Sequence, residues 1–255
     1  MTVTDVNVVK SAIFERPDDA NKGTLGSLLC VCGSYGMAGA AVMSAKGALR
    51  TGIGLAKCAL PRSIYPIVAQ TILESVYYPL SENADGRISK VNVPFLVSES
   101  CKSSATLVGC GLGVCDDTLK IVFSFIENST TPLVLDADAL NCVAKQPEIL
   151  LRKKAPIIIT PHPGEMSRLT GLATPLVNAE RERVALDFAQ KYGVVTVLKG
   201  AGTVIASPNG KVLVNPTGNS GMATGGSGDV LAGMTASILA QGASAFSSAA
   251  AAVYL

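Results

Sequence analysis

Several common functional signals are absent from this sequence of 255 residues. Only 16% of the residues are charged, the formal net charge is +2, and no basic stripe suggests a nucleic-acid partner. The seven cysteines lack the spacing of a zinc site or of a CxxC redox pair. Most of them lie in apolar stretches, as free thiols do in a reducing cytosol, so we expect a cytoplasmic protein. The charged N-terminal segment contains no apolar region suitable for a signal peptide.

Long runs of strongly apolar residues are absent as well. Residues 24–45 and 230–255 carry no charged side chain and would be long enough to span a bilayer. Both runs consist mainly of Ala, Gly, Ser and Thr, and glycines interrupt them. This weak hydrophobicity is typical of closely packed buried helices, so we expect no membrane segment.

The apolar fraction of 48% is sufficient for a large core, and no linker or repeat divides the chain. Short apolar runs alternate with amphipathic segments, which predicts an α/β fold with a mostly parallel sheet covered by helices. We expect one domain over residues 1–255 and a small hairpin late in the chain. The expected strands are Ser27–Cys32, Ile53–Leu60, Ala105–Cys110, Leu133–Asp136, Ile157–Thr160, Val194–Lys199, Thr203–Ala206 and Lys211–Val214, and helices are expected from about Gly39 to Arg50, over Asp116–Asn128 and over residues 177–192.

Glycines and polar residues follow most of the expected strands. Open α/β sheets gather their ligand groups at the carboxyl ends of the strands, so six such loops at one edge indicate a cleft. Gly33–Gly39 matches neither the GxGxxG nor the GxxxxGK[ST] pattern, and a tight turn between strand and helix explains it equally well. The loops are Gly33–Gly39, Gly111–Gly113, Asp136–Asn141, Pro161–Glu165, Lys199–Thr203 and Asn215–Asp229.

The segment Asn215–Asp229 contains the strongest functional signal. Six of its fifteen residues are glycine or proline, and Asp229 is its single charged residue. The apolar spacing beyond Asp229 predicts a helix, whose free N–H groups and positive dipole end would attract an anion. A carboxylate beside bound phosphate could accept a proton from an attacking hydroxyl. Asp229 could instead only cap the helix, but capping does not explain the glycines just before it.

Two other loops offer polar side chains with more than one interpretation. Asp136 and Asp138 would point to the same side of an extended segment, as a capped turn or as a magnesium or substrate contact. His162 is the single histidine, and its two flanking prolines would aim it into the cleft, although a lone histidine is more often structural. Glu165 is either a functional carboxylate or a first-turn residue favoured by the dipole of the next helix.

Two charged positions later in the chain are also ambiguous. Lys199 stands at the end of an expected strand, before Gly200-x-Gly202, and is either an ordinary edge lysine or a phosphate contact. Glu180–Arg183 falls on the polar side of the helix expected over residues 177–192, and we interpret it as a solvated face without a functional role.

Five motifs, taken in sequence order, resemble those of the ADP- or ATP-dependent NAD(P)H-hydrate dehydratases, a carbohydrate-kinase-related branch of the ribokinase-like fold. The resemblance covers about Lys22 to Leu255, and Cys110 departs from it because proline is usual there. The chain stops inside what resembles the family's penultimate helix, so we expect a C-terminal truncation. We also expect no epimerase domain of the kind often fused ahead of such proteins. The motifs are Gly33-Ser-x-x-Gly-Met-Ala-Gly-Ala-Ala41, Asp136-Ala-Asp-Ala-Leu-Asn141, Thr160-Pro-His-Pro-Gly-Glu165, Val197-Leu-Lys-Gly-x-x-Thr203 and Asn215-Pro-Thr-Gly-Asn with Gly225-Gly-Ser-Gly-Asp229.

The resemblance implies a three-layer sandwich and a metabolite-repair reaction of the hydro-lyase class. NADH or NADPH hydrated on its nicotinamide ring would be phosphorylated on the ring hydroxyl by ADP or ATP, and elimination of phosphate would restore the reduced dinucleotide. Asp229 would be the base, and the N–H groups of the loop Gly225, Gly226, Ser227 and Gly228 would stabilise the phosphoryl charge.

The resemblance also implies roles for individual residues. Mg²⁺ would bridge the phosphates, with Glu165 and Asn141 as candidate ligands. The adenine nucleotide would be held by Lys199, Gly200, Ala201, Gly202, Thr203 and Gly228, and the hydrated dinucleotide would touch Ala40, Gly113, His162 and Asp229.

Two alternatives of other classes remain open. A kinase for a stable alcohol, such as a vitamin precursor or a sugar, would use the same Asp229 but release a phosphorylated product. A non-catalytic nucleotide sensor would not need a carboxylate beside the phosphate. The sequence does not decide between ADP and ATP, and its Ala-rich tail over residues 243–255 could pack within the subunit or against another copy, as in a homo-oligomer.

Overall fold

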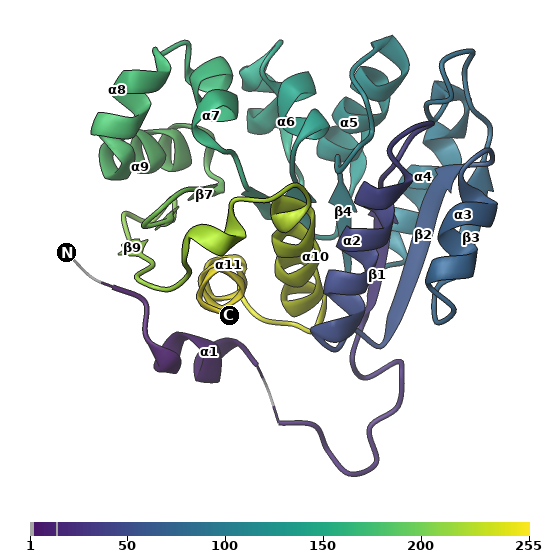
Figure 1. The fold of residues 1–255 in the computed structure, drawn as a ribbon, viewed down its shortest axis with the longest axis horizontal. Coiled ribbons are helices and arrows are strands. Elements are labelled where there is room, and N and C mark those ends of the chain that lie inside the picture. The colour runs from purple at the N-terminus through teal and green to yellow at the C-terminus, as the bar shows by residue number, and fades with distance from the viewer. Residues whose placement is uncertain (1–2, 14) are drawn as a thin grey trace.

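A nine-stranded sheet in the order β3-β2-β1-β4-β5-β6-β7-β8-β9 organises the chain (Figure 1). The computed structural model describes residues 3–13 and 15–255. Strands β3 to β7 of this order pair in parallel, as in Val31↔Val108 between β1 and β4, whereas β8 pairs antiparallel with β7 and with β9. The strands are β1 Ser27–Val31, β2 Leu55–Pro61, β3 Val76–Leu80, β4 Ala105–Val108, β5 Leu133–Leu135, β6 Ile157–Ile159, β7 Val195–Leu198, β8 Val204–Ala206 and β9 Val212–Val214.

Helices cover both faces of the sheet. Successive strand residues alternate between two cores: Leu29 faces one with α4 to α9, and Leu28 faces the other with α2, α3, α10 and α11. The helices are α1 Val6–Ala12, α2 Ala38–Arg50, α3 Tyr65–Thr71, α4 Val93–Cys101, α5 Asp116–Asn128, α6 Asp138–Val143, α7 Pro163–Thr170, α8 Thr174–Ala179, α9 Arg181–Tyr192, α10 Ser227–Ala240 and α11 Ala245–Tyr254, with 3₁₀ turns η1 Lys90–Asn92, η2 Pro147–Arg152 and η3 Ser220–Met222.

The predicted fold class is confirmed: the sheet is mostly parallel, both faces are covered, and the late hairpin is present. The continuous helix expected over residues 177–192 is wrong, because the chain breaks at Glu180 between α8 and α9. The sequence did not predict β3, an edge strand that is largely accessible and therefore lacks a buried apolar pattern.

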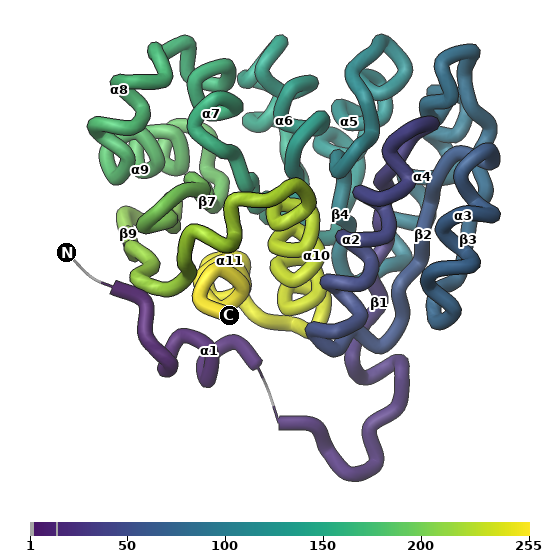
Figure 2. Tube along the Cα trace, in the orientation of Figure 1, coloured from purple at the N-terminus to yellow at the C-terminus, as the bar shows by residue number. Residues whose placement is uncertain are grey.

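Of the two charge-free segments, residues 24–45 contain β1 and the start of α2, and residues 230–255 contain most of α10 and all of α11. In the part of the chain that the structure describes, no helix has the length and apolarity needed to cross a membrane. The Ala-rich tail packs within the subunit, since Ala251 and Ala252 of α11 are buried against Ala12 of α1 and Ile238 of α10. In Figure 2 the N-terminal segment with α1 runs beneath the yellow α11, far from it in sequence.

Glycines let α2 and α10 approach each other closely. A Cβ atom added to Gly233 of α10 would lie 2.0 Å from the carbonyl oxygen of Ser44, and one added to Gly47 of α2 would lie 2.7 Å from that of Val230. Neither position could hold a side chain without moving backbone. This tight contact fixes the position of α10 relative to α2, and therefore the position of Asp229 in the first turn of α10.

Candidate functional site

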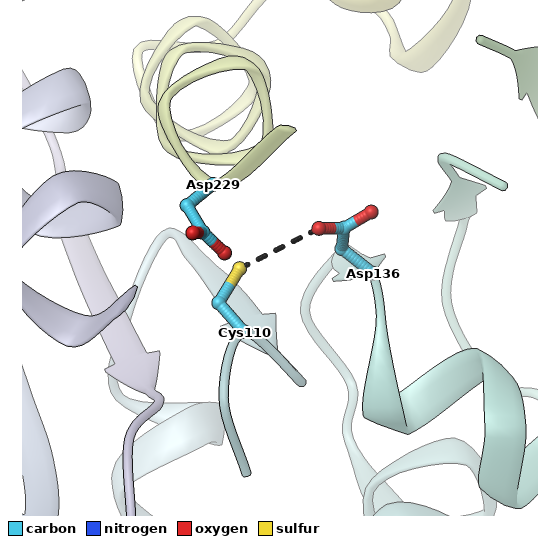
Figure 3. Close-up of side chains that lie close together, drawn as sticks. All are labelled: Cys110, Asp136 and Asp229. Atoms are coloured by element: carbon cyan, nitrogen blue, oxygen red, sulfur yellow. Dashed lines mark hydrogen bonds between the residues drawn. The ribbon is translucent and has the colours of Figure 1, made fainter. Parts of the chain in front are cut away.

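Polar side chains from four strands and one helix meet at the carboxyl edge of the sheet. Cys110 follows β4, Asp136 follows β5, Thr160 follows β6 and Lys199 follows β7. Asp229 comes from the first turn of α10 and faces Cys110 and Asp136 from across the edge (Figure 3). Residues separated by up to 119 positions thus form one cluster of charged and thiol groups.

Lys199 and Asp136 form the best-connected pair of the cluster. Lys199 Nζ lies 2.8 Å from Asp136 Oδ1, which also accepts a hydrogen bond of 2.6 Å from Thr160 Oγ1. Lys199 Nζ lies 3.9 Å from Glu165 Oε2. Burial alone would lower the pKa of Lys199, but the charges of Asp136 and Glu165 outweigh it and raise that pKa. Lys199 is therefore a largely enclosed, charged ammonium, with a side chain 18% exposed, and not an ordinary edge lysine.

Asp229 does not cap its helix. The N-cap of α10 is Gly226, and no side chain bonds to its first turn as a cap. Instead the Asp229 carboxylate lies near the Cys110 thiol and Asp136, with one ligand atom of each within 4.8 Å of the others (Figure 3). Burial and, second, the charge of Asp136 raise the pKa of Asp229. A partly buried carboxylate with a raised pKa is suited to accept a proton near neutral pH. The capping alternative is wrong, because no cap bond from the Asp229 side chain is present.

Unpaired backbone donors surround Asp229. Of the described residues, none accepts a hydrogen bond from the N–H of Gly228 or of Asp229, as expected for a first helical turn. Gly226 turns the chain with φ +95°, and Ser227 Oγ donates to the carbonyl of Met222 at 2.8 Å, which secures the loop. A Cβ atom at Gly228 would lie 3.4 Å from Lys199 Nζ. Two free N–H groups, a helix dipole and an ammonium therefore converge where the sequence predicts an anion.

Arg181, at the start of α9, lies against the loop Lys199–Thr203, a contact that the sequence did not predict. Arg181 Nη2 donates to the carbonyl of Leu198 at 2.7 Å, and its guanidinium lies 2.9 Å from where a Cβ of Gly200 would be. The interpretation of Glu180–Arg183 as a fully solvated face is thus wrong for Arg181, which is half-buried. The break at Glu180 turns the start of α9 toward β7, and periodicity did not reveal that break.

His162 and Glu165 cap α7 reciprocally. His162 Nδ1 accepts from the N–H groups of Gly164 at 3.0 Å and Glu165 at 3.3 Å, and Glu165 Oε2 accepts from the His162 N–H at 2.8 Å. Burial, followed by the charges of Lys199 and Arg168, lowers the pKa of His162. Burial raises the pKa of Glu165. Glu165 is therefore more than a first-turn residue, because it joins the cap to Lys199.

Asp138 does not point the same way along an extended segment as Asp136. Ala137 between them has φ +50°, a strained value for alanine, and Asp138 already begins α6. Asp138 Oδ2 accepts from the Gly113 N–H at 2.8 Å, and Oδ1 accepts from Asn141 Nδ2 at 3.3 Å. Asp138 thus supports the Gly113 loop, and the expectation of an extended pair is wrong.

The remaining predicted residues lie around this cluster. Ala40 is 4% exposed and packs beneath Gly111, whose Cβ position would be 2.7 Å from the Ala40 methyl. Arg87 lies over Gly113, where an added Cβ would meet its Nε at 2.5 Å, and no motif pointed to it. Asn141 Oδ1 accepts from Arg168 Nε at 2.9 Å. Asn141 Oδ1 and Glu165 Oε2, the candidate oxygens for a metal, thus both accept hydrogen bonds from protein groups.

Two cavities lie away from these residues. One of about 530 Å³ at the amino edge of the sheet is lined by residues that include Lys153, Ile157 and Phe246. The other, of about 550 Å³, lies between α7 and α9 and includes Leu169 and Phe188. Neither is lined by a predicted site residue, so the geometry of the polar cluster and not cavity size identifies the candidate site.

Most of the chain is similar in sequence to known proteins. The NAD(P)H-hydrate dehydratase family model matches residues 28–255. The ADP-dependent (S)-NAD(P)H-hydrate dehydratase of Neisseria meningitidis serogroup B is 35% identical over 94% of this chain and 78% of that protein. The bifunctional NAD(P)H-hydrate repair enzyme Nnr of Moorella thermoacetica is 38% identical over 91% of this chain. The chain spans only 44% of the length of this bifunctional relative.

Solved structures give the same picture. The ADP/ATP-dependent NAD(P)H-hydrate dehydratase of Bacillus subtilis, co-crystallized with ATP/Mg²⁺, superposes with a TM-score of 0.82 at 31% identity, covering 98% of this chain and 84% of that one. A ribokinase-like superfamily protein of Enterococcus faecalis shares the fold, with a TM-score of 0.85 at 24% identity over 99% of this chain and 84% of that one. The family resemblance and the ribokinase-like fold expected from the motifs are confirmed.

Proposed function

This chain belongs to the NAD(P)H-hydrate dehydratase family, and we propose that it restores hydrated NADH and NADPH with ADP or ATP as phosphate donor. The observation that carries the proposal is the position of Asp229. Its partly buried carboxylate lies beside two free backbone N–H groups and near Lys199, as base catalysis next to a phosphate requires. The names of the relatives favour this reaction over phosphorylation of a stable alcohol.

In the proposed reaction Asp229 accepts the proton of the ring hydroxyl, and the oxygen attacks the terminal phosphoryl group of the nucleotide. The N–H groups of Gly228 and Asp229 stabilise the charge on the phosphoryl oxygens. The bond between the ring carbon and the ester oxygen then breaks, and inorganic phosphate leaves with the bonding electrons, assisted by the ring nitrogen lone pair. Loss of a ring proton completes the dihydronicotinamide, and AMP or ADP remains from the donor.

The binding roles are proposals that rest on the residues around Asp229. Lys199–Thr203 and Gly228 would hold the nucleotide, with the Lys199 ammonium on its phosphates. Ala40, Gly113 and His162 would contact the hydrated dinucleotide. Arg87, which lies over Gly113, is positioned to meet a phosphate of the same substrate.

Mg²⁺ would neutralise phosphate charge when it is bound with the nucleotide. Glu165 and Asn141 offer oxygen donors of the kind that Mg²⁺ prefers. Glu165 Oε2, however, accepts from the His162 N–H, and Asn141 Oδ1 accepts from Arg168. Each would have to exchange a protein partner for the ion, so these two residues fit the metal only after rearrangement.

Recovery of the dihydronicotinamide absorbance from hydrated NADH or NADPH tests the proposal. We expect recovery with ADP, with ATP or with both, together with one inorganic phosphate per dinucleotide restored. A protein that binds nucleotide but restores no absorbance with either donor would disprove the dehydratase activity. Release of a phosphorylated alcohol in the same assay would identify the kinase alternative.

A further inference from the structure

The Cys110 thiol lies between the two carboxylates of the site. Cys110 is fully buried, and its Sγ is 3.7 Å from Asp136 Oδ2. Figure 3 shows the sulfur between Asp136 and Asp229, which come from β5 and α10. Cys32, which is 2% exposed, directly follows β1, the strand that pairs with β4 just ahead of Cys110. The proposed reaction uses neither sulfur.

We propose that Cys110, Asp136 and Asp229 form a binding site for a thiophilic divalent cation such as Zn²⁺ or Cd²⁺, and that the bound cation inhibits the enzyme. Thiolate and carboxylate together are a donor set for zinc, with a fourth position left for water. Mg²⁺ prefers oxygen alone, so the thiol distinguishes this site from one built for magnesium.

The distances fit a tetrahedral ion. With Zn–S near 2.3 Å and Zn–O near 2.1 Å, sulfur and oxygen ligands of a tetrahedral site are separated by about 3.6 Å. Cys110 Sγ and Asp136 Oδ2 are already 3.7 Å apart. All three ligand atoms lie within 4.8 Å of one another, so closing the site needs only a small movement of Asp229.

The carboxylate oxygens that face the thiol are available. Lys199 and Thr160 occupy Oδ1 of Asp136 and leave Oδ2 directed at Cys110. Within the described chain, no cationic side chain lies within ion-pair distance of Asp229. A bound cation would place an opposite charge directly on the Asp229 carboxylate, and the thiol proton would pass to solvent.

Inhibition follows from the identity of the third ligand. A cation on the Asp229 carboxylate occupies the lone pair that would accept the substrate proton. This consequence rests on the proposed function, whereas binding of the metal does not. The two are therefore measured separately, with binding measured in the absence of nucleotide and of dinucleotide.

The binding test uses the metal-free, reduced protein titrated with Co²⁺, followed by competition with Zn²⁺. We expect one Co²⁺ per chain with a sulfur-to-metal charge-transfer band. Cys110→Ala should abolish the band and weaken Zn²⁺ binding by about 100-fold or more. The matched control is the double variant Cys101→Ala with Cys115→Ala, which removes the more accessible thiols and should leave the band unchanged. An unchanged band in Cys110→Ala, or its loss in the control, would overturn the proposal.

A second variant covers the case in which Cys110→Ala does not fold. Cys110→Ser keeps the volume but replaces sulfur with oxygen, so it should weaken Cd²⁺ binding much more than Mn²⁺ binding. Equal weakening of both metals contradicts a sulfur ligand. In the activity assay, micromolar Zn²⁺ should inhibit the wild type and spare the Cys110 variant, each relative to its own metal-free rate.

Discussion

Lys199 Nζ donates to Asp136 Oδ1 at 2.8 Å although 63 residues separate them. The two residues follow β7 and β5, and β6 lies between these strands. Asp136 is 2% exposed, so its charge depends on Lys199 and Thr160 for compensation. This ion pair joins the carboxyl ends of β5 and β7, at the edge of the sheet that Asp229 faces.

Removal of one partner of this ion pair should destabilise the protein strongly. Lys199→Met leaves Asp136 buried without its cation, and we expect a loss of about 3–5 kcal/mol in the free energy of unfolding at neutral pH. The loss is the difference between the unfolding free energies of the wild type and the variant, measured with urea. Adding Asp136→Asn to Lys199→Met should recover much of the loss, because the unpaired charge is then removed. A double variant as unstable as Lys199→Met would show that the pair is not coupled.

Asp229→Asn should separate catalysis from binding. The amide fills the same space but cannot accept the substrate proton, so turnover should fall by about 10²–10⁴-fold. Nucleotide affinity, measured by calorimetry, should stay close to that of the wild type, because Lys199 and the free N–H groups remain. Near-normal turnover in this variant would refute the role of Asp229 as base.

His162 should make stability depend on pH. Burial and the neighbouring cations lower the pKa of His162 in the folded protein from its ordinary value of 6.5. The neutral ring accepts the cap bonds of α7, so its contribution is complete above pH 6.5 and is lost as the pH falls through the lower, folded pKa.

The variant His162→Asn keeps an acceptor for the cap without titrating in this range. Unfolding free energies between about pH 5 and 8 should show the wild type losing stability on acidification relative to His162→Asn. The chain contains one histidine, so no other imidazole contributes. Parallel pH curves for the two proteins would exclude the cap as the titrating element.

The contact between α2 and α10 should not tolerate a methyl group. A Cβ at Gly233 would lie 2.0 Å from the Ser44 carbonyl oxygen, so Gly233→Ala should cost about 1–3 kcal/mol or more in thermal or urea unfolding. Gly225→Ala is the matched comparison, because a Cβ there has no neighbour within 4 Å, and its stability should change by less than about 0.5 kcal/mol. Equal stability of the two variants would contradict the close packing.

The sequence by itself determined the fold class and the chemistry of single loops. Apolar runs predicted most strands, since a buried strand has a local signature. The glycines of Asn215–Asp229 predicted an anion site, which stays a prediction. Prediction from the sequence failed for β3, because this accessible edge strand lacks a buried apolar pattern. It also failed at Glu180, where a helix breaks without a proline or glycine to mark the break.

Only the tertiary structure decided which side chains meet. Local periodicity carries no information on strand order, so it did not show that Asp136 and Lys199 form an ion pair or that Arg181 leaves the solvated face. Cys110 stood out in the sequence only as a departure from proline. Its position between two carboxylates follows from the pairing of β4 with β5 and the close contact of α10 with α2, which are both long-range packing events.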